Sequence, residues 1–561
     1  MVAETVNRWV GRISARRLSS QCRSIAERVA AREPEFRTLS DADLAALTGA
    51  YRERIAAGED LSDLAVEAFA AVREAVRRTL GLRLHEEQIM AGAAMAAGAI
   101  ADMAAGEGKT LACAPPAYLW ALEGSAVHVL TSDDHRAEQA VRRLEPVYRA
   151  LGVDIGLIRP DLEQAARREA YASDVVYGSL DQIGFDLLRD DMASHPSEVV
   201  QRGLGVAVVD DARTWFIDEL RRELRLSAAA PQEAVERRAE WIRAARSLSR
   251  EAGDYAVDRI RRLVRLREPG IAKLRELLEV DDLDPIENAV PLALTAAVLR
   301  AREFAEKEEP APDEEITVKK ISAVGVLREY EGVCGVSTDA APEAEIFRRC
   351  YGVTVVPIPS RRPAEGGPRS ARAPEHFEED VVFLHTVDLQ RRETASRRAA
   401  VLAEEDCSSM IEDLLAEFVE QELHGLPRTL GREDVEDALD RLHRVCPIST
   451  TADELMRAPR RTDVAARLRD DVAEAYRRRE DRFGSEVMRA LGRLVLLRVL
   501  DRCWHEHLAR AEALLDSLRL LDALGDDPLA DHLNAVAESY GLLEREFCRN
   551  SVDRLFRLEV R

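Results

Sequence analysis

The chain has 561 residues, 46% of them hydrophobic, which is enough to build more than one buried core. Its formal net charge of -23 argues against nucleic acid as the main partner, because an acidic protein repels phosphates unless a local basic groove overrides its field. The eight cysteines show no CxxC spacing, which argues against a zinc cluster or a disulfide framework and is typical of a reducing cytosol. No apolar run approaches the ~18 residues of a membrane span, so no transmembrane helix is expected.

Residues 1–80 are predicted to be helical, since apolar side chains recur there at helical spacing. Within this segment, residues 7–24 have a basic amphipathic pattern with Trp9, Val10 and Ile13 on one side. Two interpretations stay open for that pattern. The helix either lies on an anionic membrane or a partner, or it packs on its own domain.

Short apolar runs alternate with helical stretches over residues 81–223, and strand-like runs return at 317–360. This alternation predicts a parallel sheet covered by helices. Residues 224–316 are charged and mostly helical in pattern, and residues 364–380 have the Pro/Gly/Arg-rich composition of a linker. Residues 381–561 are helical in pattern throughout. The predicted fold class is therefore α/β plus all-α.

The stretch GEGKT, residues 106–110, follows a predicted strand and opens a predicted helix, which is the setting of a phosphate-binding loop. Gly106 and Gly108 let backbone N–H groups approach phosphate oxygens. Lys109 can then reach the β- and γ-phosphates, and the Thr110 hydroxyl can ligate Mg²⁺. The sequence thus predicts a nucleotide site with bound magnesium.

Lysine usage supports this prediction, although the strict GxxxxGK[ST] pattern fails because Met103 occupies its first glycine position. A tight turn that happens to contain lysine is the alternative. Positive charge in the chain is almost entirely arginine, yet the loop keeps lysine, whose slim ammonium suits phosphates better than a planar guanidinium. Lysine occurs at only five positions, Lys109, Lys273, Lys307, Lys319 and Lys320.

A carboxylate that orders Mg²⁺ is expected at the end of a later strand, and "GVAVVDD", residues 205–211, supplies Asp210 there. In helicase-type ATPases the next residue is glutamate, which orients the attacking water. Here it is Asp211, one methylene shorter. Because an error of about 1 Å can cost ~10²-fold in rate, Asp211 is a weakened candidate for the catalytic base.

Together with their neighbours, these residues resemble the SecA preprotein translocase ATPases, which drive unfolded proteins through the SecYEG channel. The resemblance implies that Gln88 reads the adenine of ATP, that Glu107 belongs to the phosphate loop, and that Met103 is the family's own residue. It implies ATP and Mg²⁺ as cofactors and a RecA-like motor domain. The stretches that carry it are "GLRLHEEQIMAGAAMAAGAIADMAAGEGKT", "VHVLTSDDHRAEQA", "YGSLDQIGFDLLRD" and "AVVDDARTWFIDE".

The same resemblance implies a domain plan for the rest of the chain. Residues 1–80 are similar to the family's N-terminal helices, and residues 81–223 with 317–363 to its first nucleotide-binding domain. Residues 224–316 resemble a reduced preprotein cross-linking domain. Residues 381–561 resemble the helical scaffold and wing with the two-helix finger.

The sequence also departs from the family pattern. The linker 364–380 stands where the second motor domain should begin, and that domain supplies the arginines that stabilise the transferring phosphate. Without such an arginine, phosphoryl transfer slows by ~10³–10⁵-fold. "STDA" at 337–340 replaces the family's TGTA motif, Ala523 replaces a bulky residue at the finger tip, and the zinc-binding tail is missing.

Two hypotheses within protein export follow. The first is an ATP-binding translocase subunit that acts with the SecYEG channel on preproteins. The second is a non-hydrolysing, nucleotide-dependent module that docks on an intact SecA, on the translocon or on a client polypeptide, or self-associates. Either protein is expected in the cytoplasm or peripherally at the inner face of the cell membrane. A remote third hypothesis is an RNA helicase-like ATPase, against which the acidic charge counts.

His505 and His507 in "CWHEHLAR" have the spacing of metal ligands only superficially. At i and i+2 they point to different sides of a helix. We therefore expect no metal site there. The resemblance to the family's scaffold implies that Trp504 and Leu508 are core residues.

Overall fold

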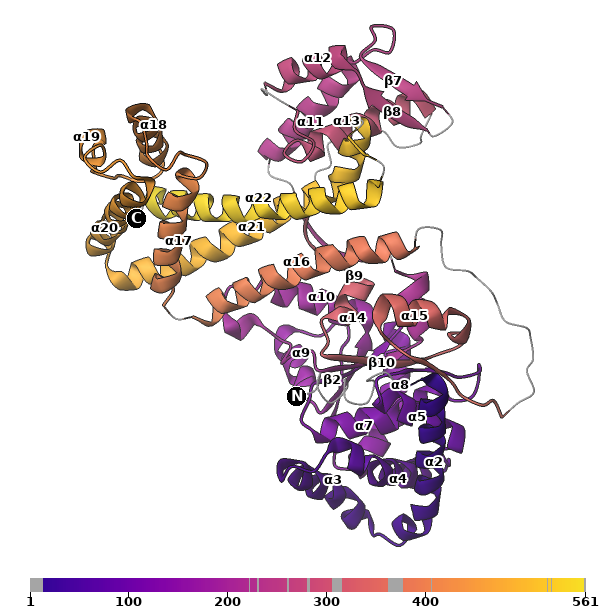
Figure 1. Cartoon of the computed structure of the whole chain (residues 1–561). Helices are drawn as coiled ribbons and strands as arrows, with labels where there is room; N and C mark the ends of the chain where they lie inside the picture. Colours follow the sequence, from indigo (N-terminus) through magenta and orange to yellow (C-terminus); the bar gives the residue numbers. More distant parts are fainter. Residues whose placement is uncertain are drawn as a thin grey trace. The chain divides into compact units, whose positions relative to one another are not determined.

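The computed structural model describes residues 14–558 except 221, 230–231, 260–261, 280–282, 305–314, 362–376, 405, 522 and 526. The chain divides into two compact units (Figure 1). One comprises residues 1–226 and 320–385, and the other comprises residues 227–319 and 386–561. Among the described helices, none is both long and apolar enough to cross a bilayer.

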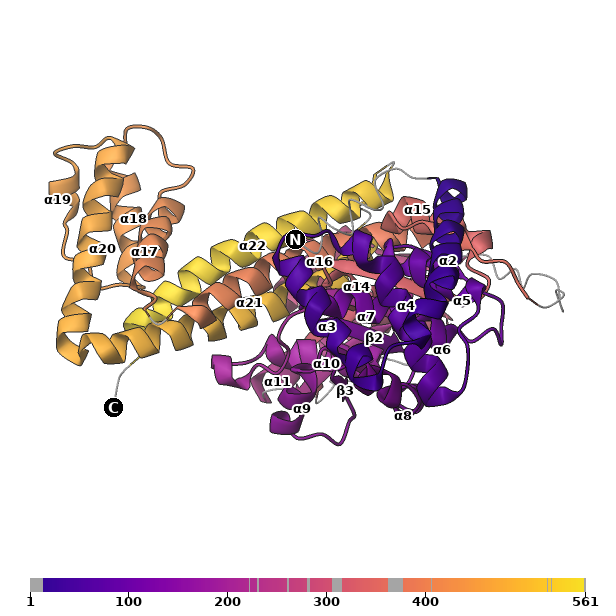
Figure 2. The same cartoon turned by 90° about the horizontal axis from the view of Figure 1, so that it is seen from below.

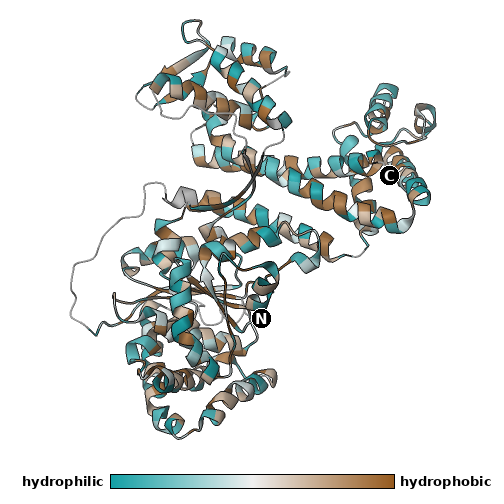
Figure 3. Cartoon of the chain, turned by 180° about the vertical axis from the view of Figure 1, so that it is seen from behind, coloured by the Kyte–Doolittle hydropathy of each residue, from teal (hydrophilic) through white to brown (hydrophobic). Residues whose placement is uncertain are grey.

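A seven-stranded parallel sheet forms the centre of the first unit. Its order is β11-β1-β10-β5-β2-β4-β3. The strands are apolar and brown in the hydropathy view (Figure 3), as expected for a sheet covered on both faces. The predicted α/β class is thereby confirmed. The strands are β1 Ile100–Asp102, β2 Val127–Thr131, β3 Ile155–Leu157, β4 Val175–Ser179, β5 Val206–Asp210, β10 Gly332–Ser337 and β11 Val355–Pro357.

Helices fill the connections of this sheet, because parallel strands cannot be joined by a tight turn. Two short helices, α6 and α7, follow β1 directly, and α8 follows β2 (Figures 1 and 2). Their bounds are α5 Glu86–Ala96, α6 Lys109–Ala112, α7 Ala114–Leu122, α8 Asp134–Ala150, α9 Gln164–Tyr171, α10 Leu180–Asp190, α14 Ala323–Arg328 and α15 Ala344–Tyr351.

The N-terminal helices share one apolar core with the sheet. They are α2 (Ala15–Arg37), α3 (Asp41–Ala56) and α4 (Leu61–Leu80). Ser40 starts α3 with a capping box, and Phe69 of α4 belongs to the same buried cluster as the sheet residues. The predicted helices of residues 1–80 are therefore part of the first unit. The amphipathic pattern's Trp9, Val10 and Ile13 lie outside the described residues.

The insertion 227–319 of the second unit combines three helices with a small hairpin. These are α11 (Gln232–Ser247), α12 (Glu268–Leu278), α13 (Ala289–Phe304), and β7 (Tyr255–Asp258) paired with β8 (Leu263–Leu266). They enclose a separate core that includes Tyr255, Leu274 and Leu299. Strands β6 (Glu223–Ala229) and β9 (Glu315–Ser322) form a two-stranded sheet where the chain enters and leaves the insertion.

The C-terminal part is helical, as predicted. Helices α21 and α22 lie side by side, joined by a turn in which the Ala523 N–H donates to the Leu518 carbonyl (2.9 Å) (Figures 1 and 2). Helix α16 begins at Phe377, before the predicted end of the linker at 380. The helices are α16 Phe377–Ala403, α17 Ser408–Glu422, α18 Arg432–His443, α19 Ala452–Leu455, α20 Arg461–Phe483, α21 Ser485–Leu520 and α22 Pro528–Arg557.

His507 is a core residue of this part. Its Nδ1 is 3.0 Å from the Ser539 hydroxyl and its Nε2 is 3.0 Å from the Gln390 Oε1, so it joins α21, α22 and α16. Trp504 and Leu508 are buried beside it, which confirms their predicted place in the core. Among the described residues, no cluster of ligating side chains could hold a metal ion.

Candidate functional site

The loop of residues 106–110 connects β1 to α6. Gly106 and Gly108 have φ angles of 79° and 81°, in the left-handed region that favours glycine. A Cβ at Gly108 would lie 2.4 Å from Nε2 of Gln88. Glycine at 108 is thus required both by the backbone conformation and by the close approach of Gln88.

Gln88, in the first turn of α5, braces this loop. Its Nε2 donates to the Glu107 carbonyl (3.0 Å) and the Gly108 carbonyl (3.4 Å), and its Oε1 accepts from the His85 N–H (2.9 Å). The structure therefore places the residue expected to read adenine directly beside the phosphate loop, with both ends of its amide engaged by the backbone.

The Glu107 side chain ties the loop to the segment that follows β11. Its Oε1 accepts from the Ser360 hydroxyl (2.7 Å) and from the Arg361 N–H (2.8 Å). Its Oε2 is buried and finds no hydrogen-bond donor in the described part of the chain. An incompletely satisfied carboxylate inside a phosphate loop is costly and marks a polar site.

Three polar residues lie together at the carboxyl edge of the sheet, and Asp210 is the one that the sequence predicted as a site residue. Asp102, Ser337 and Asp210 end the adjacent strands β1, β10 and β5, and the register sets Asp102 opposite Ser337 and Val336 opposite Asp210. This edge is where open α/β sheets bind ligands. The phosphate loop and the predicted magnesium carboxylate are thus separated by one strand.

Lys109 faces this middle strand. Its Nζ donates to Oγ1 of Thr338 (2.8 Å), the residue after β10. Burial raises the pKa of the Asp210 carboxyl, and the charges of Lys109 and Arg136 oppose that rise. The charges of Lys109 and Asp210 therefore interact in one small region of this edge. Thr110 follows Lys109 in the first turn of α6.

Asp211 has an unusual backbone. Its φ of 71° is left-handed, a conformation that costs a non-glycine residue free energy and is typical of functional sites. Its N–H donates to the Val336 carbonyl (2.9 Å), and its Oδ1 accepts from the Ser337 hydroxyl at a long 3.5 Å. The side chain is therefore held at the β10 edge by a weak contact.

Mg²⁺ with a nucleotide fits the donor set of this edge. The Thr110 hydroxyl and the Asp210 carboxylate are oxygen ligands of the kind that Mg²⁺ prefers, and the ion ordinarily completes its shell with phosphates and water. Lys109 supplies a compensating cation.

Sequence reasoning missed several residues of this site. Asp102 accepts hydrogen bonds from the N–H groups of Ala340 (3.1 Å) and Ala341 (3.2 Å), and burial raises its pKa. Thr338 and Arg136 were likewise not singled out. Each of these residues could have been found from its position in the sequence, because each lies at or after the carboxyl end of a predicted strand.

Two family models match the chain. The model described as the SecA DEAD-like domain covers residues 6–348, and the SecA wing and scaffold domain covers residues 383–559. The chain belongs to the SecA family. The phosphate loop lies inside the first match, and the second match covers all but the two residues at each end of the segment 381–561.

Curated SecA proteins are similar over more than half of this chain. Protein translocase subunit SecA 1 of Thermobifida fusca is 36% identical over 63% of the chain and 40% of its own length. SecA of Kocuria rhizophila is 39% identical over 63% and 42%, and SecA of Rubrobacter xylanophilus is 38% identical over 62% and 43%. The chain thus spans about two fifths of the relatives that it matches.

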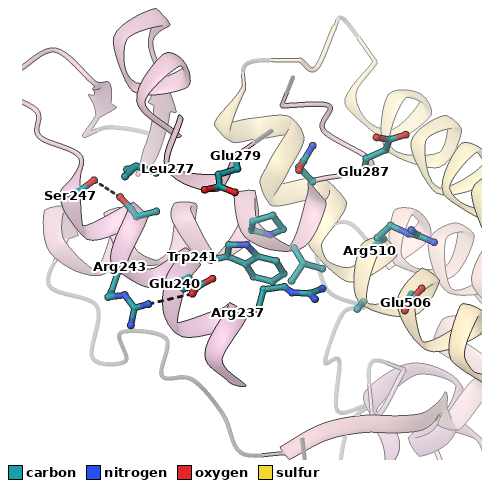
Figure 4. Close-up of a pocket in the computed structure, with 15 residues that line it drawn as sticks. Arg237, Glu240, Trp241, Arg243, Ser247, Leu277, Glu279, Glu287, Glu506 and Arg510 are labelled. Atoms are coloured by element: carbon teal, nitrogen blue, oxygen red, sulfur yellow. Dashed lines mark hydrogen bonds and ion pairs between the residues drawn. The ribbon is translucent and has the colours of Figure 1, made fainter. Parts of the chain in front are cut away.

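A second concave site lies within the second unit of this SecA-family chain. It encloses about 970 Å³ between α11, the residues around the start of α13, and α21 (Figure 4). Trp241 stands among its lining, with exposed Leu277 on the rim and Arg510 on the opposite wall. The charged lining residues are Arg237, Glu240, Arg243, Glu279, Glu287, Glu506 and Arg510.

Proposed function

We propose that this protein is an ATP-binding component of SecA-type protein export. Lys109 holds the β- and γ-phosphates, while Thr110 and Asp210 ligate the Mg²⁺ that arrives with ATP. The observation that carries the proposal is the carboxyl edge, where the left-handed loop glycines and Lys109 lie one strand from Asp210. Membership of the SecA family supports the same process.

The proposed task of the chain's own residues is binding rather than rapid hydrolysis. Magnesium would neutralise phosphate charge, but Asp211 has a short side chain and a strained backbone for orienting water. The family models leave only residues 349–382 between them, which is too few for a second motor domain. We therefore expect slow turnover unless a partner supplies the missing arginine.

The proposed partners follow from the same argument. We expect the protein to act with the SecYEG channel and preproteins, in the cytoplasm and at the inner face of the cell membrane. Its nucleotide cleft would be completed by an intact SecA or a second copy. The alternative is a binding module that uses ATP occupancy alone to dock on those partners.

Titration of the purified chain with a fluorescent ATP analogue tests the proposal. Lys109→Ala should weaken binding by about 10- to 100-fold, because it removes a charge-assisted hydrogen bond to phosphate. Arg149→Ala, an exposed residue of α8, is the control and should bind like the parent. Absence of saturable binding by the parent chain would contradict the proposal.

Phosphate release, measured with and without an intact SecA, separates the two hypotheses. The phosphate released by intact SecA alone is subtracted from that of each mixture. A translocase subunit should then add turnover that rises when intact SecA is present and vanishes in Lys109→Ala. A non-hydrolysing module should add none, alone or with SecA, while it still binds the analogue. Turnover by the chain alone at a rate that SecA does not change would contradict the expected need for a partner.

The cavity around Trp241 favours a second role, the binding of an unfolded client polypeptide. Trp241, Leu277 and Pro291 line the same cavity and suit apolar side chains, and the charged lining residues suit a polar backbone. Figure 4 shows Trp241 among these charged residues. Trp241→Ala should lower the affinity for an unfolded apolar peptide about tenfold, as expected for an aromatic hot spot. Leu494→Ala, an exposed site elsewhere on α21, should leave it unchanged.

A further inference from the structure

Lys109 has a protein partner at the place where the proposed function needs it free. Its Nζ donates to the Thr338 hydroxyl at 2.8 Å, a good hydrogen bond from a charged donor. The two residues are 229 positions apart in the sequence, so the contact is made by the fold and not by local chain geometry. One of the three N–H donors of the Lys109 ammonium is thus already directed at the protein, away from the loop that would hold phosphate.

The turn that carries Thr338 is held on both sides. The Ser337 carbonyl accepts from the Met103 N–H (2.9 Å), at the base of the phosphate loop. Further along, the Asp102 carboxylate accepts from the N–H groups of Ala340 and Ala341. Because the backbone is fixed before and after Thr338, its hydroxyl is presented to Lys109 at little entropic cost.

The residue type at 338 decides whether the contact exists. In the TGTA pattern that STDA replaces, the position of Thr338 is a glycine, which has no side-chain oxygen to offer. The neighbouring Asp339 has a φ of 60°, so this turn keeps a left-handed residue without having glycine there. The hydroxyl beside Lys109 is therefore supplied by threonine at 338, and glycine there would offer no such acceptor.

We propose that Thr338 is a positioning residue that competes with nucleotide phosphate for Lys109 and so lowers the affinity of the site for ATP. The inference rests on the proposed function, because it assigns a regulator to the same loop. In the nucleotide-free chain Lys109 is held by Thr338. On binding, Lys109 exchanges one hydroxyl acceptor for charged phosphate oxygens, and only the difference between the two bonds contributes to affinity.

Replacement of the hydroxyl by a methyl group tests the proposal. Thr338→Val keeps the branched shape and removes the acceptor, so it should tighten ATP binding about tenfold. AMP has neither a β- nor a γ-phosphate and should bind the parent and the variant alike. Thr338→Ser restores the hydroxyl and should restore parental affinity. Thr79→Val, which removes a hydroxyl bonded within α4, is the matched control.

The outcomes distinguish this inference from the proposed function. A gain for ATP without a gain for AMP, reversed by serine, supports competition for Lys109. If the parent binds ATP and Thr338→Val gains nothing, or gains equally for AMP, the inference is wrong while the proposed function stands. If neither protein binds ATP, both fail. Circular dichroism melts confirm that each variant is folded.

Discussion

The polar groups at the carboxyl edge of the first unit differ from those buried in the helices of the second. At the edge, Glu107 leaves one buried carboxylate oxygen without a donor in the described structure, and Asp211 has a left-handed backbone. In the helical unit, Asp471 accepts from the Ser449 and Thr450 backbone and from the Ser449 hydroxyl. Glu107 and Asp211 thus carry an unmet hydrogen bond and a strained backbone where a ligand is proposed, whereas the Asp471 carboxylate finds its partners within the protein.

The difference separates residues kept for binding from residues kept for packing. A buried group with all its partners in the protein gains nothing from a ligand and loses stability when it is changed. A buried group that lacks a hydrogen-bond partner, or a residue with a strained backbone, lowers the stability of the protein unless a bound ligand compensates for it. Variants in the two regions should therefore affect different measurements.

The largest effect is expected at Asp501 of α21, whose carboxylate is shared by two buried cations. It accepts from Lys319 Nζ (3.1 Å) and Arg398 Nε (3.0 Å), whose side chains are 7% and 6% exposed. Asp501→Ala should lower the free energy of unfolding by about 3 kcal/mol, because it removes the carboxylate that both cations share. Urea denaturation measures this, and ATP affinity should not change.

Asp453→Ala in the same unit is the control for Asp501. Asp453 pairs with Arg432 on the surface, where both side chains are more than half exposed. Surface pairs of this kind contribute about 0–1 kcal/mol. Equal losses of unfolding free energy in the two variants would contradict the claim that the Asp501 cluster is stabilising because its two cations are buried.

The next effect compares two left-handed glycines of the first unit. Ala at Gly81, where a Cβ meets open space, should cost about 1 kcal/mol from backbone strain alone. Ala at Gly108 adds a Cβ 2.4 Å from Gln88 Nε2, so the amide must move and its two carbonyl bonds are lost. We expect about 2–3 kcal/mol in unfolding free energy.

The affinity for ATP gives a second comparison of the same two glycine variants. Gly108→Ala should also weaken ATP binding, since it distorts the loop that meets the phosphates, whereas Gly81→Ala should not. Both variants are titrated with the fluorescent ATP analogue after their stability is measured. A loss of affinity in Gly81→Ala as large as in Gly108→Ala would show that general destabilisation, and not loop geometry, controls binding.

The site was predictable where its residues are contiguous or end an apolar run. GEGKT is a local pattern, and Asp210 follows a run of four small apolar residues that reads as a buried strand. The parallel sheet was predictable for the same reason, because strands buried on both faces are apolar without interruption.

The order of the strands was not predictable, and the missed residues follow from it. Strand β10 begins at Gly332, more than 200 residues after β1 ends, yet it lies between β1 and β5. No local pattern encodes that placement, which depends on packing across the whole unit. Thr338 and its bond to Lys109 therefore became visible only in the fold. Helical spacing likewise set His505 and His507 on different sides of one helix but could not name Gln390 and Ser539 as the partners of His507.

At neutral pH the smallest effect is expected at His507, whose contribution shows itself as a change in the pH dependence of stability. Burial, together with the charge of Arg510, lowers the pKa of His507 to about 3 in the folded protein, against 6.5 for an ordinary histidine. As the pH falls below 6.5, protons bind the unfolded chain before they bind the folded one. The stabilisation by neutral His507 is thus complete above about pH 6.5 and is lost progressively towards about pH 3.

Replacement of His507 by glutamine should remove this proton linkage. The slope of unfolding free energy against pH should fall by about 1.4 kcal/mol per pH unit between pH 6 and 4, relative to the parent. His424→Gln, at an exposed histidine, is the matched control. An unchanged slope in His507→Gln would mean that the imidazole can take up a proton where it stands. Burial and two hydrogen bonds would then not suffice to keep His507 neutral, and His507 would differ from Asp471, whose partners hold it in one charge state.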